Sequence, residues 1–371
     1  MSLKALRHFD PENLCIPSYP NATTDDFHVA IKLVDAGGKR LGEIAPSQQG
    51  EVNLTTHAEF LSDDSVGPVA LRGANVGRYL FNDTPKQGKP KYLLRDQFLK
   101  AHGPDTKADD HRHIRIGYQR GAAIDNWRRI IATIIEPGNF CTDTINYISE
   151  PKAYDLFAIL ALLNSSVWEW RFRLTSTNNH VNAYEIDAMS LPRIEFTTPV
   201  AKRATQLAKG KQLCEKSLAG GDAPNTLDFV EAELEARRTD VMHDLLAFLA
   251  ERMIAMNRQK RTTAKQFLTD LKDFHGIDAR ALNPKTKLDE FWKLELAELF
   301  AHLQKNVRRL EEQKVRLSKE VEDKIRSRFL SAKEALLPLE GQIALTDQLI
   351  DRVVYRLYGL TPEEIKIVEG A

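Results

Sequence analysis

The pattern of apolar and polar residues changes character near residue 198. Before it, short β-branched and aromatic runs alternate with turns rich in proline and glycine, which predicts strands and loops. After it, prolines become rare and apolar residues recur every three to four positions, which predicts amphipathic helices. The pattern therefore predicts an α+β fold, with a mixed α/β domain over 1–198 and a mainly α-helical domain with long helices over 199–371.

Individual elements of the first domain follow from the same pattern. Residues 27–34 alternate between apolar and polar side chains, which predicts a strand, and 41–44 would return beside it as a hairpin. Residues 127–135 and 140–148 predict a second strand pair around a Pro-Gly turn. Residues 154–170 predict one helix packed on that sheet.

The second domain is predicted to be built from helices. Residues 200–218 form a helix that stops at a Gly-Gly pair, and 226–257 form one long amphipathic helix. Residues 305–336 are highly charged with sparse apolar positions, which predicts a long exposed helix or a helical hairpin arm. Thr361 and Pro362 are an N-cap and a first-turn proline, so a short final helix begins there.

The composition is balanced in charge. Lys+Arg and Asp+Glu both number 52, so the net charge is zero and any nucleic-acid face must be local. Three widely spaced cysteines indicate reduced thiols and a cytoplasmic location. The longest apolar run, 156–163, is too short to span a membrane, so no membrane partner is expected.

A polar stretch directly follows this apolar run. Residues 171–182, RFRLTSTNNHVN, carry hydrogen-bonding side chains at a density unusual for a core. Each unpaired buried polar group costs about 1–3 kcal/mol, so we expect this stretch to be exposed to a polar partner. The alternative is a turn cluster in which the asparagines satisfy their own backbone.

Several motifs, taken in order, resemble one enzyme family. Residues 156–194, LFAILALLNSSVWEWRFRLTSTNNHVNAYEIDAMSLPRI, resemble the end of the target-recognition domain in type IIG restriction–modification enzymes and TaqI-like adenine-specific DNA methyltransferases. The stretches 50–54 (GEVNL), 71–79 (LRGANVGRY) and 128–148 (RRIIATIIEPGNFCTDTINYI) fit the same pattern. The tail 349–369 is similar to the C-terminal ends of such enzymes.

The resemblance implies a module that recognises a sequence in double-stranded DNA for a methyltransferase or nuclease domain or subunit. The sequence has neither the Gly-rich loop for S-adenosylmethionine nor the Asn-Pro-Pro-aromatic tetrapeptide, from which Asn283-Pro284-Lys285 departs at its third position. We therefore expect S-adenosylmethionine and Mg²⁺ only in an associated catalytic domain, and neither methyl transfer nor cleavage by this chain alone. Whether that domain shares the same polypeptide stays open.

The expected DNA contacts follow from residue type. Lysines and arginines position phosphates, whereas Arg, Asn and His read base edges. Loop cations near 86–115 are expected on phosphates, and Arg171 and Arg173 would share one exposed face if the chain is extended there. The candidate DNA-binding residues are Arg72, Arg78, Lys86, Lys89, Lys91, Arg112, Arg115, Arg171, Arg173, Thr175, Asn178, Asn179, His180 and Asn182.

Other interpretations of the sequence remain open. The chain could be a helical protein-interaction subunit in which 200–371 is the working part. It could also be a specificity subunit of the type I kind, serving a separate methylase chain. His111 and His113 could share one metal on a strand, but the sequence offers no further ligands at recognisable spacing.

Overall fold

The contacts within the chain group it into two compact units. The first unit comprises Met1–Ile254 and Asp347–Ala371, and the second comprises Ala255–Thr346. Residues 199–254 and the C-terminal segment thus group with the α/β part, whereas the sequence-based boundary at 198/199 follows the change in hydrophobic pattern. The computed structural model describes residues 3–11, 14, 22–82, 88–103, 106–220 and 224–370.

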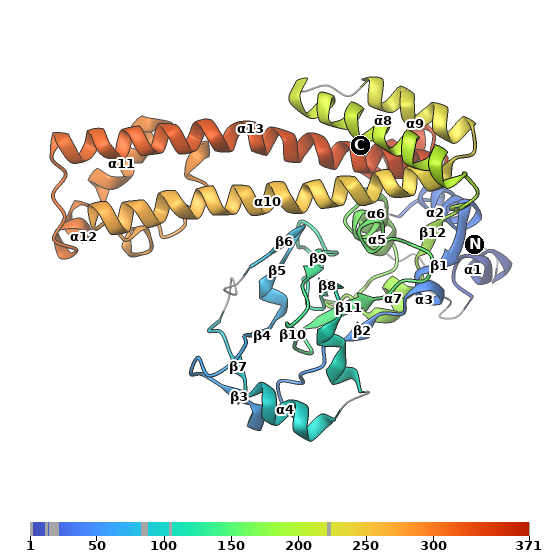
Figure 1. Ribbon diagram of the computed structural model, residues 1–371, viewed down its shortest axis with the longest axis horizontal. Helices are drawn as coiled ribbons and strands as arrows, with labels where there is room; N and C mark the ends of the chain where they lie inside the picture. The colour runs from blue at the N-terminus through green and yellow to red at the C-terminus, as the bar shows by residue number, and fades with distance from the viewer. Residues whose placement is uncertain are drawn as a thin grey trace. The chain divides into compact units, whose positions relative to one another are not determined.

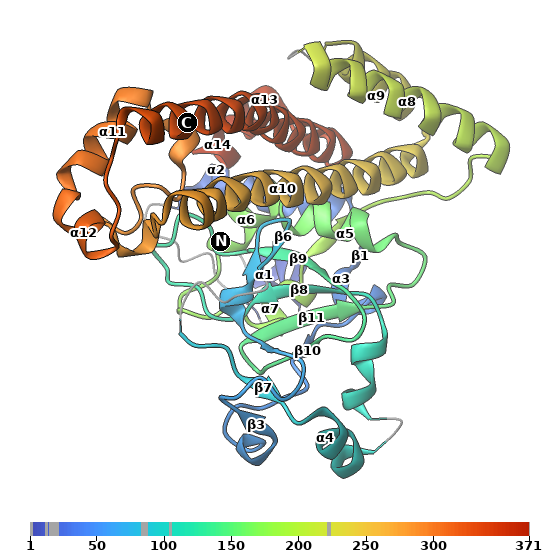
Figure 2. The ribbon, with the colours of Figure 1, turned by 60° about the vertical axis from the view of Figure 1, so that its left-hand side comes forward.

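The predicted α+β fold class is confirmed, with small sheets in the first unit and long helices towards the C-terminus. The largest sheet has four antiparallel strands in the order β2-β11-β8-β9. Their bounds are Gln48–Gln49 (β2), Arg115–Gln119 (β8), Ala132–Ile135 (β9) and Ile145–Ser149 (β11). Figure 2 shows β8 and β11 side by side at the centre of this unit.

The described residues also form four two-stranded sheets. Three are antiparallel and one, β4 with β10, is parallel. The pairs are β1 (Gly37–Arg40) with β12 (Ser190–Pro192), β3 (Leu61–Ser62) with β7 (Tyr92–Leu93), β4 (Ala70–Leu71) with β10 (Phe140–Cys141), and β5 (Val76–Gly77) with β6 (Leu80–Phe81).

The described chain also contains α-helices in both units. Those of the first unit are α1 (Leu3–Phe9), α2 (Thr24–Ala36), α3 (Leu41–Ile44), α4 (Arg95–His102), α5 (Leu156–Leu163), α6 (Ser166–Arg173), α7 (Ala183–Asp187), α8 (Val200–Gly220), α9 (Pro224–Glu235) and α14 (Pro362–Glu369). The second unit holds α11 (Leu296–Lys305) and α12 (Val307–Glu312). The long helices α10 (Thr239–His275) and α13 (Lys319–Leu357) each have residues in both units.

The single helix predicted over 154–170 is two helices, α5 and α6, joined at Asn164. The Asn164 side chain donates to the carbonyl of Ala132 at 3.0 Å and accepts from its N–H at 3.3 Å. Ser165 then begins α6 by accepting from the N–H of Trp168 at 3.3 Å. The Asn164 side chain therefore joins the end of the buried helix α5 to strand β9. The break between the helices sets the direction of α6.

The C-terminal segment belongs to the first unit because it is hydrogen-bonded to α6. The Trp168 indole donates to the Tyr358 hydroxyl at 3.1 Å, and Ser166 donates through its N–H and its hydroxyl to Asp351 at 2.7 and 2.6 Å. Trp168 and Tyr358 are each 1% exposed, and such low exposure strengthens the bond between them.

Two local predictions at the N-terminal end are wrong. Residues 27–34 lie in helix α2 rather than a strand, because Thr23 and Asp26 form a capping box and the apolar residues also repeat at helical spacing. Residues 41–44 form the short helix α3, so no hairpin forms. Strand β1 pairs with the distant β12 instead.

Two further predictions fail, the first for a long-range reason and the second for a local one. Strands β9 and β11 are both present, but β8 lies between them and pairs with each. The helix predicted over 226–257 is divided, because Arg237 adopts a positive φ of 56° and Arg238 pairs with Glu233 at 2.8 Å between α9 and α10. The predicted helix at 200–218 and the capped final helix, α14, are confirmed.

In the second unit, the C-terminal part of α10 packs along the N-terminal part of α13 (Figure 1). The Phe267 ring lies 4.0 Å from Phe291 and 6.1 Å from Phe329, measured between centroids. Lys260 of α10 pairs with Glu340 of α13 at 2.8 Å. The charged arm predicted over 305–336 is divided: α12 ends at Glu312, and α13 begins only at Lys319.

Among the described helices, none combines the length and the apolar character needed to cross a membrane.

A buried ion pair stabilises the central sheet. Arg115 and Glu51 are fully enclosed and lie 3.1 Å apart, and Arg115 also donates to the carbonyl of Asn139 at 2.6 Å. Its guanidinium lies 4.7 Å from the centre of the Tyr147 ring. Arg115 is thus a residue of strand β8 and not the exposed loop cation that the sequence predicted.

We expect Arg115→Ala to reduce the free energy of unfolding by about 3–5 kcal/mol, because it leaves the Glu51 carboxylate buried without its partner. Arg112→Ala is the control, since the Arg112 side chain is 64% exposed and should change stability by at most about 0.5 kcal/mol. Urea denaturation of both variants measures the difference. A loss below about 1 kcal/mol for Arg115→Ala would contradict this role for the pair.

Candidate nucleic-acid interface

Two loops of the first unit lie side by side and form one exposed surface. They comprise residues 120–129 and 174–182, and we name them together the two-loop surface. Their backbones are joined where Val181 donates to the carbonyl of Arg120 at 2.7 Å and Ala122 donates to that of Asn179 at 3.0 Å. The loops therefore present their side chains from a common, hydrogen-bonded support.

Glu169 of α6 holds the first of the two loops, residues 120–129. Its carboxylate accepts from the N–H groups of Arg129 and Ile130, each at 2.8 Å, and from the Arg173 guanidinium at 2.6 Å. Arg173 in turn donates to the carbonyl of Asn126 at 2.7 Å. This buried carboxylate thus holds the loop 120–129 directly through backbone N–H groups and indirectly through Arg173.

Arg129 supports the second loop. Its guanidinium donates to the carbonyls of Asn178 at 2.6 Å and His180 at 3.1 Å. Burial, followed by the neighbouring Arg173, lowers the pKa of Arg129 from its ordinary value. With its side chain 1% exposed and its donors directed at backbone oxygens, Arg129 shapes the surface rather than contacting a ligand.

The exposed side of the two-loop surface combines one large aromatic with polar groups. Trp127 is 74% exposed, far more than is usual for a tryptophan, and Ile124 is 41% exposed. On the other loop, Asn178, Asn179 and His180 are all exposed. Such a combination offers stacking area together with hydrogen-bond donors and acceptors.

The two asparagines are oriented by their own neighbourhood. The Asn178 side-chain oxygen accepts from the N–H of His180 at 2.7 Å, and that of Asn179 accepts from the N–H of Ile124 at 3.1 Å. Each oxygen keeps a second lone pair, and each amide nitrogen keeps two donors. The turn-cluster alternative is thus correct for the Asn178 oxygen, whereas the Asn179 oxygen bonds to the other loop, and both amide groups remain available to a ligand.

Three other predicted contacts in this stretch have structural roles. Arg171 and Arg173 lie in helix α6 rather than in an extended segment, so the expectation that they share an exposed face is wrong. Arg171 is 8% exposed, with its guanidinium 3.9 Å from the centre of the Phe9 ring and 3.2 Å from the Thr175 hydroxyl. Asn182 forms the capping box of α7 with Glu185.

The remaining predicted cations divide by exposure. Arg78 is largely enclosed, pairs with Asp347 and donates to the carbonyl of Asn164 at 2.6 Å. Arg72 is half-buried, and its backbone N–H is capped by Asn75 at 2.9 Å. Both therefore lie within the fold, as Arg115 does, rather than on an open loop.

Three cations remain at the surface. Lys89 is exposed, Lys91 pairs with Asp63 at 2.7 Å, and Arg112 pairs with Asp109 at 3.1 Å. Exposed pairs of this kind contribute little to stability, so their charges can turn towards phosphates. Lys86 lies outside the described residues.

Sequence reasoning missed Trp127, which it assigned to a buried strand. The available signal was its position directly after the polar pair Asp125-Asn126, at the start of the apolar run rather than within it. Strand β9 begins only at Ala132, so Trp127 falls in the preceding loop.

The histidine pair at 111 and 113 shows no metal geometry. The His111 ring is buried and stacked 4.3 Å from the Phe140 ring, whereas His113 pairs with Glu150 at 3.0 Å. Burial lowers the pKa of His111. Across the part of the chain that the structure describes, no three His, Cys, Asp or Glu side chains gather as a metal ion would require.

Comparison with known families matches residues 239–354 to DUF8810, a domain of unknown function. The match runs from the start of α10 to near the end of α13 and includes the whole second unit. No curated protein matches the chain. The match recognises the long helices and carries no activity with it.

We expect Glu169→Gln to loosen the two-loop surface, because an amide nitrogen would replace one of the two oxygens that accept backbone N–H groups. An unsatisfied buried donor costs about 1–3 kcal/mol, and the amides of Ala122, Ile124 and Val181 should exchange faster with deuterium. Glu150→Gln is the control, since that side chain is 70% exposed. Unchanged exchange in Glu169→Gln would show that the loops are held without this carboxylate.

Proposed function

We propose that this chain is the sequence-specific double-stranded DNA recognition module of a restriction–modification adenine methyltransferase or endonuclease. The observation that carries the proposal is the two-loop surface, which presents an exposed tryptophan on one loop and exposed, oriented asparagines on the other. The resemblance of the sequence motifs to target-recognition regions supports the same function.

The asparagine amides suit contacts with base edges. In the major groove, guanine offers two acceptors, while adenine offers an acceptor and a donor that an asparagine can match with both ends of its amide. Asn178 and Asn179 are held in one orientation by backbone N–H groups, so little rotational freedom is lost on binding. His180 adds a ring that can donate or accept beside them.

Trp127 suits contact with the faces of bases. Aromatic and apolar side chains that bind duplex DNA enter base steps, and enzymes that modify a base first remove it from the stack. An indole that is 74% exposed on a supported loop is available for either contact without rearrangement of the fold. We propose that Trp127 stacks on a base at or beside the recognised site.

The surface cations would place the duplex. Lys89, Lys91 and Arg112 are proposed to contact phosphates, which fixes the register of the duplex without reading sequence. Methyl transfer or cleavage is proposed to reside in an associated domain or subunit, which would supply S-adenosylmethionine and Mg²⁺.

The proposal is tested by selecting duplexes bound by the intact chain from a random pool at physiological salt. We expect enrichment of one short sequence that the chain binds more tightly than unrelated duplex DNA, by the wide margin typical of specific recognition. Recovery of duplexes without a shared sequence would reduce the function to non-specific binding. Binding to no duplex would favour the helical interaction subunit instead.

We expect Trp127→Ala to weaken binding to the selected duplex by about 1–3 kcal/mol, the range measured when an aromatic that stacks on a base is removed. Thermal stability should stay unchanged, because the indole contributes little to the core. Phe274→Ala is the control, since Phe274 is another exposed aromatic, at 65%, and lies in the second unit. Equal effects of both substitutions in fluorescence anisotropy would remove Trp127 from the interface.

A further inference from the structure

The two units carry opposite net charges, although the chain as a whole is neutral. Residues 255–346 contain 19 Lys+Arg and 14 Asp+Glu, so this unit has a net charge of +5. The first unit holds the remaining 33 basic and 38 acidic residues, a net charge of −5. The excess of cations thus lies in the second unit, to which the proposed function gives no role.

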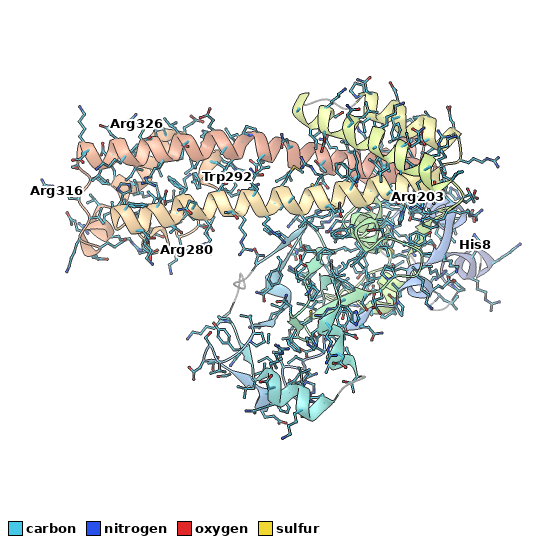
Figure 3. All side chains as sticks on the ribbon, in the orientation of Figure 1. His8, Arg203, Arg280, Trp292, Arg316 and Arg326 are labelled. Carbon is cyan, nitrogen blue, oxygen red and sulfur yellow. The ribbon has the colours of Figure 1, made fainter. Side chains whose placement is uncertain are left out.

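Within the second unit, the excess charge gathers where two segments meet. Asn306 exchanges hydrogen bonds with Asn283, at 2.8 Å to its N–H and 3.0 Å to its carbonyl. Arg309 donates to the carbonyl of Ala281 at 2.8 Å. These contacts bring the loop 280–287 against the region from α11 to the start of α13. Figure 3 shows Arg316 projecting from this end of the unit.

We name the cations at this junction the basic end. All are exposed except the half-buried Lys287, and none is in an ion pair among the residues that the structure describes. They are Lys285, Lys287, Lys305, Arg308, Lys314 and Arg316. By contrast, other cations of the unit do have acidic partners, such as Lys272 with Asp278 and Lys324 with Glu320.

The positive potential acts on a neighbouring group. Burial, followed by the charges of Lys287 and Lys305, lowers the pKa of the His302 ring. Over 280–287 and 296–319, the exposed acids are Glu298 on α11 and Glu311 and Glu312 on α12, which are fewer than the six cations of the basic end. A surplus of unpaired cations at one end of a unit is the electrostatic footprint of a polyanion site.

The surface chemistry favours nucleic acid over an acidic protein. Protein interfaces have an apolar core depleted in charge, whereas protein–DNA interfaces are polar and strongly positive. Among the described residues from 276 to 316, the exposed large apolar side chain is that of Val307, which is 47% exposed. We propose that the basic end binds the phosphate backbone of duplex DNA without reading its sequence. The choice of DNA as the polyanion rests on the proposed function.

The test compares two triple variants of the intact chain that remove the same charge. Lys305→Gln, Arg308→Gln and Lys314→Gln neutralise the basic end. Lys272→Gln, Lys324→Gln and Arg326→Gln neutralise two lysines and an arginine of the same unit that are exposed and lie beside acidic partners. Thermal unfolding checks that both variants fold.

The readout is the slope of log affinity against log salt, measured by anisotropy on a selected and an unrelated duplex. Each lost phosphate contact should reduce the slope by about 0.9, so the first variant should lose up to about 2.7 on both duplexes, and the second little. Equal slopes for the first variant and the unaltered chain would overturn this inference alone. Equal losses in both variants would also overturn it, since net charge would suffice. An unaltered chain that binds no duplex would overturn the proposed function as well.

Discussion

The carboxylate of Glu169 fixes the geometry on which the candidate interface depends. It accepts two backbone N–H groups of one loop and the guanidinium of Arg173, all within 2.8 Å. A buried carboxylate is costly unless every lone pair finds a donor, so these partners are as necessary to Glu169 as it is to them. The loop 120–129 is consequently held in one arrangement, and the loop 174–182 is hydrogen-bonded to it through Ala122 and Val181. The exposed indole and amides are therefore presented from fixed positions.

Buried arginines extend the same principle through the first unit. Arg115, Arg128 and Arg129 all direct their donors at carboxylates or backbone carbonyls inside the fold. A guanidinium has five donors in a fixed plane, so one such side chain can join several loops that lack regular secondary structure. In a unit whose strands are mostly two to five residues long, these contacts replace the cross-strand bonds of a larger sheet.

Charge is distributed differently in the two units. In the first, buried arginines make internal contacts, and the two-loop surface offers uncharged amides and an indole. In the second, unpaired cations stay at the surface. A division between reading groups and backbone-binding charge would let sequence recognition and affinity be set by separate parts of the chain.

The sequence by itself determined the fold class, the final capped helix and the residue types at the candidate interface. Periodicity and capping depend on neighbouring residues, which sequence displays directly. Tertiary structure decided which strand lies beside β11 and where the helix after Asp155 breaks. It also decided which cations point outwards: Arg115 and Arg171 are buried, whereas Trp127 is exposed. These outcomes depend on partners far away in sequence, such as Glu51 for Arg115 and Ala132 for Asn164, and no local pattern specifies such a partner.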